Sequence, residues 1–237
     1  MLTVDITAAE PLVTALAAAL GAAAAGPLLM RAVPVYRTQL LGASGAVASG
    51  VMFGAAYLIM ASSMRSWPGI TPLAAVVTVP VIFAAHRAMR RSSPLGAVSR
   101  RMALLHGIPE GIALGTALAA QFPLGLWVAV TIAAHNVAEG ALFAARTRDT
   151  GVSMSLGRAM LLAFVDKLPQ AAAAASSWLL VVASPLAAAP LFASAFAGLV
   201  YLVIAELLME AYARIGRVGV ALTVMAAGAV VAALGGR

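Results

Sequence analysis

Two short motifs in this chain place a histidine and a glutamate four residues apart. The first runs from His106 to Glu110 as His-Gly-Ile-Pro-Glu, and the second from His135 to Glu139 as His-Asn-Val-Ala-Glu. Residues i and i+4 share a face of an α-helix, so each motif presents an imidazole beside a carboxylate. Two such helices in contact would offer two nitrogens and two oxygens, a ligand set that suits zinc or a similar divalent metal. The spacing therefore predicts a metal site formed by these four side chains.

The composition is that of a membrane protein. The chain has 237 residues, of which 63% are hydrophobic and 10% are charged, and its mean hydropathy is +1.01. Soluble domains are typically about 45–50% apolar and about 25% charged. The sequence contains no cysteine, which excludes disulfide bonds and thiolate metal ligands. We therefore expect a polytopic membrane protein whose metal ligands are nitrogen and oxygen atoms.

Eight apolar stretches are long enough to cross a bilayer, which takes about 20 residues. Asp5 and Glu10 precede the first of them, where a signal peptide would carry basic residues, so we expect it to be a permanent span. The prediction is an all-α fold in which residues 1–237 form a single transmembrane domain. The predicted spans cover roughly residues 11–30, 40–62, 70–88, 102–120, 123–145, 158–183, 190–212 and 216–235.

The arginines predict the orientation of these spans. The net charge of +7 comes from arginines between apolar runs, which is typical of membrane topology and argues against a nucleic-acid partner. If both termini lie outside, only Arg65 and Arg237 fall on the outer side. The positive-inside rule therefore predicts that both termini are outside. The inner arginines are then Arg31, Arg37, Arg87, Arg90, Arg91, Arg100, Arg101, Arg146, Arg148, Arg158, Arg214 and Arg217.

Ionisable residues within the spans lie at similar depths. At about 1.5 Å per residue from the nearest inner arginine, His106 and Glu110 lie roughly 8 and 14 Å deep. Glu139 and His135 lie about 10 and 16 Å deep, and Asp166 in the sixth span lies about 12 Å deep. The fourth and fifth spans run in opposite directions, so the histidine of one motif is level with the glutamate of the other. A shared site between the fourth, fifth and sixth helices is therefore expected.

Prolines and glycines predict two local features of these spans. Pro109 and Pro169 each remove a backbone hydrogen bond, and two interrupted helices beside a polar layer are typical of transporters. Glycines four residues apart, at positions 50 and 54 and at positions 111 and 115, would let helices approach closely. For both features the alternative is ordinary helix packing without a functional role.

Most of the remaining intramembrane polar residues allow two interpretations. Asp166 and the adjacent Lys167 could form a structural ion pair, although neighbouring helical residues do not face each other well. Glu206 and Glu210 share a helix face and are either interfacial residues or the inner mouth of a cation path. His86 adjoins Arg87 and is interpreted as interfacial.

The motifs resemble those of the ZIP (Zrt-/Irt-like) family of metal transporters, and the resemblance covers most of the chain. Its core is HGIPEGIALG at 106–115 and HNVAEG at 135–140, supported by FVDKL at 164–168 and ELLMEA at 206–211. The resemblance implies a divalent metal importer without a prosthetic group. Its cargo would be zinc, or else iron, manganese or cadmium. It also implies a bilayer location, a homodimer as one assembly, and no enzymatic activity. Abundant arginine and short loops favour a bacterial inner membrane.

The resemblance also implies specific ligands. A first site would use His106, Glu110, His135 and Glu139, and a second would add Asn136 and Asp166, with the two glutamates bridging. Three departures affect the second site. Gly107 stands where the family usually has asparagine, Asp166 where glutamate is commoner, and Lys167 where proline is usual. These departures argue against a two-metal centre.

Three other functions remain open from the sequence. An intramembrane metal-dependent hydrolase could use the same ligands to activate water. The His-Glu-x-x-His order of metalloproteases is absent, however, and no further carboxylate is clearly placed as a base. A purely structural metal site and a proton-coupled carrier of another solute are the remaining alternatives.

Overall fold

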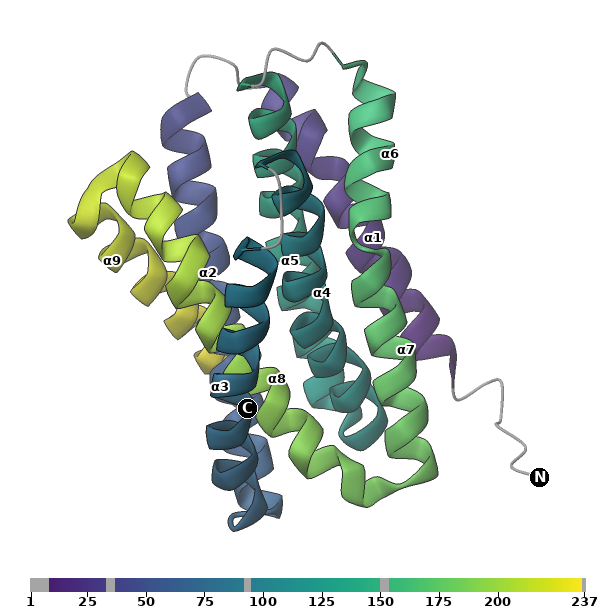
Figure 1. Ribbon diagram of the computed structural model, residues 1–237. Helices are drawn as coiled ribbons and strands as arrows, with labels where there is room; N and C mark the ends of the chain where they lie inside the picture. Colours follow the sequence, from purple (N-terminus) through teal and green to yellow (C-terminus); the bar gives the residue numbers. More distant parts are fainter. Residues whose placement is uncertain (1–8, 33–36, 92–94, 150–153, 236–237) are drawn as a thin grey trace.

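The structure is a computed structural model that describes residues 9–32, 37–91, 95–149 and 154–235 (Figure 1). Asp5, Arg237 and the side chains of Glu210 and of several inner arginines lie outside the described part. Within these ranges the chain is helical and contains no strand. The α-helices are α1 (Glu10–Ala32), α2 (Arg37–Ser66), α3 (Ile70–Arg91), α4 (Leu95–Ala120), α5 (Phe122–Asp149), α6 (Leu156–Asp166), α7 (Leu168–Ala183), α8 (Ala188–Leu202) and α9 (Leu208–Gly235). A 3₁₀ turn at Pro185–Ala187 precedes α8, and a π-helical turn at Val203–Leu207 joins α8 to α9.

Six stretches of the described residues are long and apolar enough to cross a membrane. They are Glu10–Ala32, Leu41–Ser66, Ile70–Ala88, Phe122–Ala145, Pro185–Leu207 and Ala211–Gly235. Many large apolar side chains on them are exposed, as expected of surfaces that face lipid. The chain is therefore an all-α integral membrane protein, as the composition predicted.

Two predicted spans, the fourth and the sixth, are not among these six stretches, for identifiable reasons. The sixth is divided at Lys167 into α6 and α7, which have 11 and 16 residues. The fourth corresponds to α4, whose side chains are described only from His106 onwards.

The seventh and eighth predicted spans separate inside α9, where Gly216 has φ 72° and ψ 170°. Because φ is positive there, glycine is the residue suited to this reversal. The count of eight spans stays a prediction.

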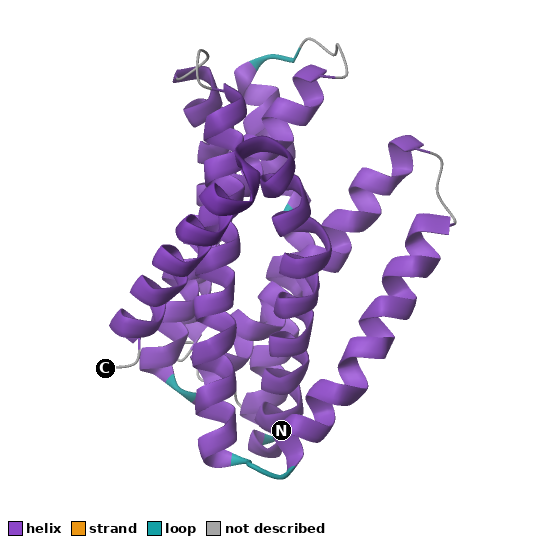
Figure 2. Ribbon diagram, turned by 90° about the vertical axis from the view of Figure 1, so that its left-hand side faces the viewer, coloured by secondary structure: helices purple, strands orange, loops and turns teal. Residues whose placement is uncertain are grey.

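The helices form one bundle, in which two groups of neighbours are in extensive contact with each other (Figures 1 and 2). In the first group, α1 packs on α5 and α6, and α4 packs on α5 and α7. In the second group, α2 packs on α8 and α9, and α3 packs on α8. Contacts of α2 with α5 and of α4 with α8 join the groups. Helices α4 and α5, which carry the two motifs, therefore lie in one group and face the other.

Close helix contacts occur at the glycine pairs, as predicted. A Cβ atom at Gly111 or Gly115 would overlap the carbonyl oxygens of Gln170 or Ala174 in α7. At positions 50 and 54 a Cβ atom would lie 2.5 and 2.6 Å from atoms of α9. The glycine pair on α4 thus fixes the spacing between α4 and α7. The predicted ligands lie on either side of this helix contact.

The two prolines behave differently from each other. Helix α4 continues through Pro109 without a break, so the expected interruption of the fourth span is wrong. Pro109 is instead buried against Gly198 of α8, where a Cβ atom would lie 2.7 Å from the proline ring. The sixth span is interrupted as expected, because Pro169 occupies the first turn of α7, where a missing N–H costs nothing.

Candidate metal centre

Three predicted ligands converge between α4 and α5. Glu110 of α4 and His135 and Glu139 of α5 form the group of potential metal ligands found among the described residues, with donor atoms within 4.8 Å of one another. Nε2 of His135 lies 2.8 Å from Oε1 of Glu110 and 3.3 Å from Oε1 of Glu139. Glu110 and His135 are each 1% exposed, whereas the Glu139 side chain is 18% exposed. The group is thus closed on the Glu110 side and accessible at Glu139.

The close approach of His135 to Glu110 does not have the geometry of a hydrogen bond. Within the described part of the chain, Oε1 of Glu110 and both ring nitrogens of His135 have no hydrogen-bond partner of acceptable geometry. Burying such atoms unpaired costs free energy, so they mark a place where another group is needed. Lone pairs that converge without hydrogen bonding suit a divalent cation with nitrogen and oxygen ligands.

Asn136 and Gln170 are buried polar residues that are hydrogen-bonded to each other beside the centre. The Asn136 amide donates to the carbonyl oxygen of Ala19 in α1 and to Oε1 of Gln170 in α7. The distance from Nδ2 of Asn136 to each oxygen is 3.0 Å. Its Oδ1 atom is buried without a hydrogen-bond partner among the described residues. Gln170, 1% exposed, was missed by the sequence analysis, although an amide one residue after Pro169 in an apolar span was a usable signal. Its backbone packs against Gly107, where a Cβ would lie 3.0 Å from the Gln170 nitrogen.

Lys167 closes the remaining side of the group. It lies at the break between α6 and α7, with φ −93° and ψ 0°, and is 5% exposed. Its Nζ atom lies 3.4 Å from Oε2 of Glu110 and donates a close hydrogen bond to Oε2 of Glu139. Lys167 therefore pairs with two of the predicted metal ligands, Glu110 and Glu139, and the ion pair with Asp166 considered from the sequence stays a prediction.

Two predicted ligands are not part of this group of three. Asp166 is half-buried at the end of α6 and is not among the three converging side chains. Nε2 of His106 lies 3.6 Å from Oε2 of Glu206, which belongs to the other helix group. The sequence placed the histidine of each motif level with the glutamate of the other, and the pair of His135 and Glu110 has this arrangement.

A second polar cluster lies around Glu206. Nδ1 of His86 in α3 lies 3.7 Å from Oε1 of Glu206, opposite the contact that His106 makes with Oε2. The Tyr201 hydroxyl lies 3.2 Å from Nδ1 of His86, and the two rings meet edge to face. His86 is 6% exposed, because packing of α3 on α8 turns the imidazole inward. Its depth in the membrane, interpreted from the sequence as interfacial, stays a prediction.

The backbone around Glu206 is a π-helical turn. The turn covers Val203–Leu207, and the Leu208 N–H donates to the Val203 carbonyl. Such turns shift the helix register by one residue and occur frequently at functional sites. Here the shifted register brings Glu206 within reach of His86 and His106. The side chain of Glu210 lies outside the described part of the structure.

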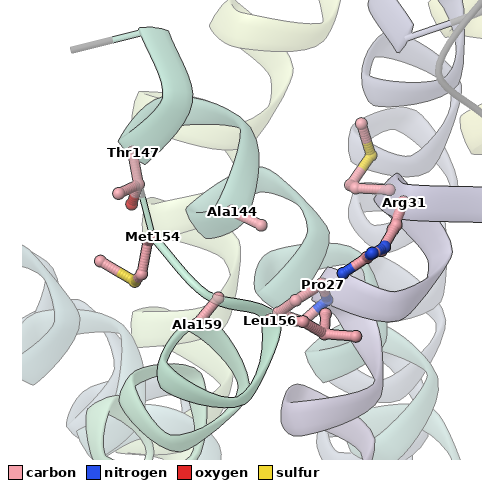
Figure 3. A pocket seen from close by; sticks show the side chains of 8 residues that line it. Pro27, Arg31, Ala144, Thr147, Met154, Leu156 and Ala159 are labelled. Atoms are coloured by element: carbon pink, nitrogen blue, oxygen red, sulfur yellow. The ribbon is translucent and has the colours of Figure 1, made fainter. Parts of the chain in front are cut away.

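A separate pocket lies between α1, α5 and α6 (Figure 3). It has an empty volume of about 450 Å³ and is open to the surface. Pro27, Met30 and Leu156 give it an apolar wall, and Arg31 and Thr147 supply polar groups. None of the predicted metal ligands lines it. The pocket therefore takes no part in the centre.

Comparison with known proteins adds no family assignment. No protein-family model matches the chain, and no curated protein matches it.

Proposed function

We propose that this protein imports a divalent metal cation, zinc in the first instance, across the membrane toward the cytoplasm. One observation carries the proposal. The donor atoms of Glu110, His135 and Glu139 lie within 4.8 Å of one another between helices of a membrane protein. Ionisable side chains are costly in the bilayer and usually line a substrate or ion pathway. Two carboxylates and one imidazole would replace much of the hydration shell of a cation such as Zn²⁺ or Cd²⁺.

The arrangement of the second cluster supports a path for the cation. His106 lies one helical turn before Glu110 on α4, and it faces Glu206 and thus the cluster with His86. Polar groups therefore continue from the centre toward the end of α4 that was predicted to be cytoplasmic. We assign the role of inner receiving site to Glu206, with His86 and His106 beside it.

The packing of the helices supports alternating access. The centre belongs to α4 and α5 in one helix group, while Glu206 follows α8 in the other. Movement of one group against the other would separate His106 from Glu206 and change the side from which Glu139 is reached. This fits transport by one group of helices rocking against another around a fixed site. The proposal includes eight spans, both termini outside and a bacterial inner membrane.

The decisive experiment is metal flux into proteoliposomes that contain the purified protein. Uptake of Zn²⁺ and Cd²⁺ is expected for the wild type and is expected to fall to the level of empty liposomes in Glu110→Gln and His135→Ala. Glu10→Gln is the matched control, because Glu10 is an exposed carboxylate at the start of α1. Wild-type liposomes that take up no Zn²⁺, Cd²⁺, Fe²⁺ or Mn²⁺ would refute the proposal.

The same preparation separates the alternative functions. Hydrolysis without metal flux would identify a metal-dependent hydrolase. Uptake of an organic solute that ignores added zinc would identify a carrier of another kind. Metal that binds tightly but is never released across the bilayer would identify a structural site.

A further inference from the structure

Lys167 is the one lysine in the sequence, and the fold brings its ammonium group into the centre. The side chain is 6% exposed although an ammonium is strongly hydrated in water. A buried cation is tolerated when carboxylates surround it, and here Glu110 and Glu139 do so. Lys167 lies at the break between α6 and α7, so it belongs to the continuous face of neither helix. This position places its side chain beside the two carboxylates.

Each of the two carboxylates uses one oxygen toward His135 and the other toward Lys167. Oε1 of Glu110 and Oε1 of Glu139 are the atoms near Nε2 of His135. Oε2 of Glu110 and Oε2 of Glu139 are the atoms near Nζ of Lys167. A pair of carboxylates that faces two positions in this way is the geometry by which glutamates bridge two cations. The ammonium lies at one of these positions, and the imidazole borders the other.

We propose that the ammonium of Lys167 is a built-in occupant of the second cation position, so that the centre carries a single divalent metal ion at a time. The inference rests on the proposed function and deepens it by fixing the stoichiometry. Two carboxylates and one ammonium leave one net negative charge, enough to attract one divalent ion and too little to hold two. The buried Oδ1 of Asn136, which has no hydrogen-bond partner among the described residues, would help to ligate a second ion once the ammonium is removed.

The lysine also sets how tightly the single ion is held. A positive charge that contacts both carboxylates opposes a divalent ion bound to the same groups. The expected consequence is faster release, at the expense of affinity. Lys167 thus sets the affinity of the centre, and the metal ligands remain Glu110, His135 and Glu139.

Equilibrium dialysis with Cd²⁺ on the purified protein in detergent tests the proposal. The wild type is expected to bind one Cd²⁺ at the centre, defined as the binding lost in Glu110→Gln. Lys167→Met, which keeps the length and removes the charge, is expected to bind two Cd²⁺ there, the first at least about tenfold more tightly. Lys167→Arg, which keeps the charge, should return to one. Arg158→Met is the matched control, because Arg158 is an exposed cation on α6.

Flux measurements and a spectroscopic probe complete the test. In proteoliposomes, Lys167→Met should lower KM and also lower the maximal rate, whereas a purely structural role would lower the rate alone. Because the chain has one lysine, ¹³C,¹⁵N-lysine labelling gives one side-chain signal. Addition of Cd²⁺ should shift that signal in the wild type and leave it unchanged in Glu110→Gln. Lys167→Gln replaces Lys167→Met if the methionine variant does not fold.

The outcomes separate this inference from the proposed function. Two Cd²⁺ at the wild-type centre, or one in both the wild type and Lys167→Met, would overturn the inference while the metal centre stands. No Cd²⁺ at the centre of either protein would overturn both the inference and the proposed function.

Discussion

His135 and Glu110 meet across the interface of two antiparallel helices, with Nε2 of the imidazole 2.8 Å from Oε1 of the carboxylate. Both side chains are almost completely buried, and they approach without the geometry of a hydrogen bond. Burial excludes water as a replacement ligand, so the position of each donor atom must be accurate. The two glutamates of the centre differ in this respect, because Glu139 is partly exposed.

Shortening Glu110 should therefore weaken metal binding more than shortening Glu139. Glu110→Asp withdraws an oxygen inside a closed site, and we expect a loss of metal affinity of at least about tenfold. In Glu139→Asp, water at the exposed side can bridge the gap, so the loss should be smaller. Cd²⁺ binding to the two purified variants measures the difference. Equal losses, or a larger loss at Glu139, would contradict the assignment of the closed side to Glu110.

The close contact between α4 and α7 gives a prediction about stability. In Gly115→Ala the new Cβ would meet the Ala174 carbonyl and the Ser177 hydroxyl, so the helices must separate. Overpacking of this kind typically lowers the free energy of unfolding by about 1–3 kcal/mol. Gly21→Ala is the control, because a Cβ there meets no atom within 4 Å. Thermal unfolding in detergent should show a lower midpoint for Gly115→Ala and an unchanged or higher one for Gly21→Ala.

Much of the fold could be predicted because the bilayer restricts what an apolar sequence can form. Each predicted span has a helix near its place, and the predicted gap between the last two spans, residues 213–215, adjoins Gly216, the residue with positive φ. The convergence of Glu110 on His135 followed from helix periodicity and opposite chain direction. These features depend on local sequence and on the length needed to cross a membrane.

The remaining features depend on packing between distant helices. His106 was expected beside Glu139, but a π-helical turn in a different helix group presents Glu206 to it. His86 was interpreted from its neighbour Arg87 alone, and its contact with Tyr201 of α8 was not anticipated. Proline chemistry alone predicted a break at Pro109, whereas a glycine of α8 accommodates the ring and the helix continues. No local pattern encodes such contacts.

The orientation of the chain can be measured with single cysteines, since the natural sequence has none. Ser184 and Gly157 are both exposed, and the arginine distribution places them on opposite sides of the membrane. In intact cells, a membrane-impermeant thiol reagent should label Ser184→Cys at once and Gly157→Cys only after permeabilisation. The reverse pattern would invert the proposed topology and with it the direction of import.

Transport should weaken as the pH falls from neutral to acidic values. Protons and metal compete for the lone pairs of His135 and the two glutamates, because a ligand must be deprotonated to bind. Acidification should therefore raise KM for Zn²⁺ more than it lowers the maximal rate, and excess Zn²⁺ should restore the flux. Proteoliposome assays with equal pH on both sides measure this. A flux that stays flat across the range would show that protonation does not control binding.

The cluster around Glu206 should affect release of the metal more than its binding. Glu206→Gln removes the charge that faces His86 and His106 and leaves the three converging ligands in place. We expect Cd²⁺ affinity at the centre to change less than about twofold, since the substitution lies outside the ligand set. The maximal rate of uptake should fall severalfold, because the ion leaving the centre loses its receiving carboxylate. Glu10→Gln serves again as the control for loss of a carboxylate elsewhere. Unchanged uptake in Glu206→Gln would remove Glu206 from the path, whereas loss of Cd²⁺ binding would make it part of the centre itself.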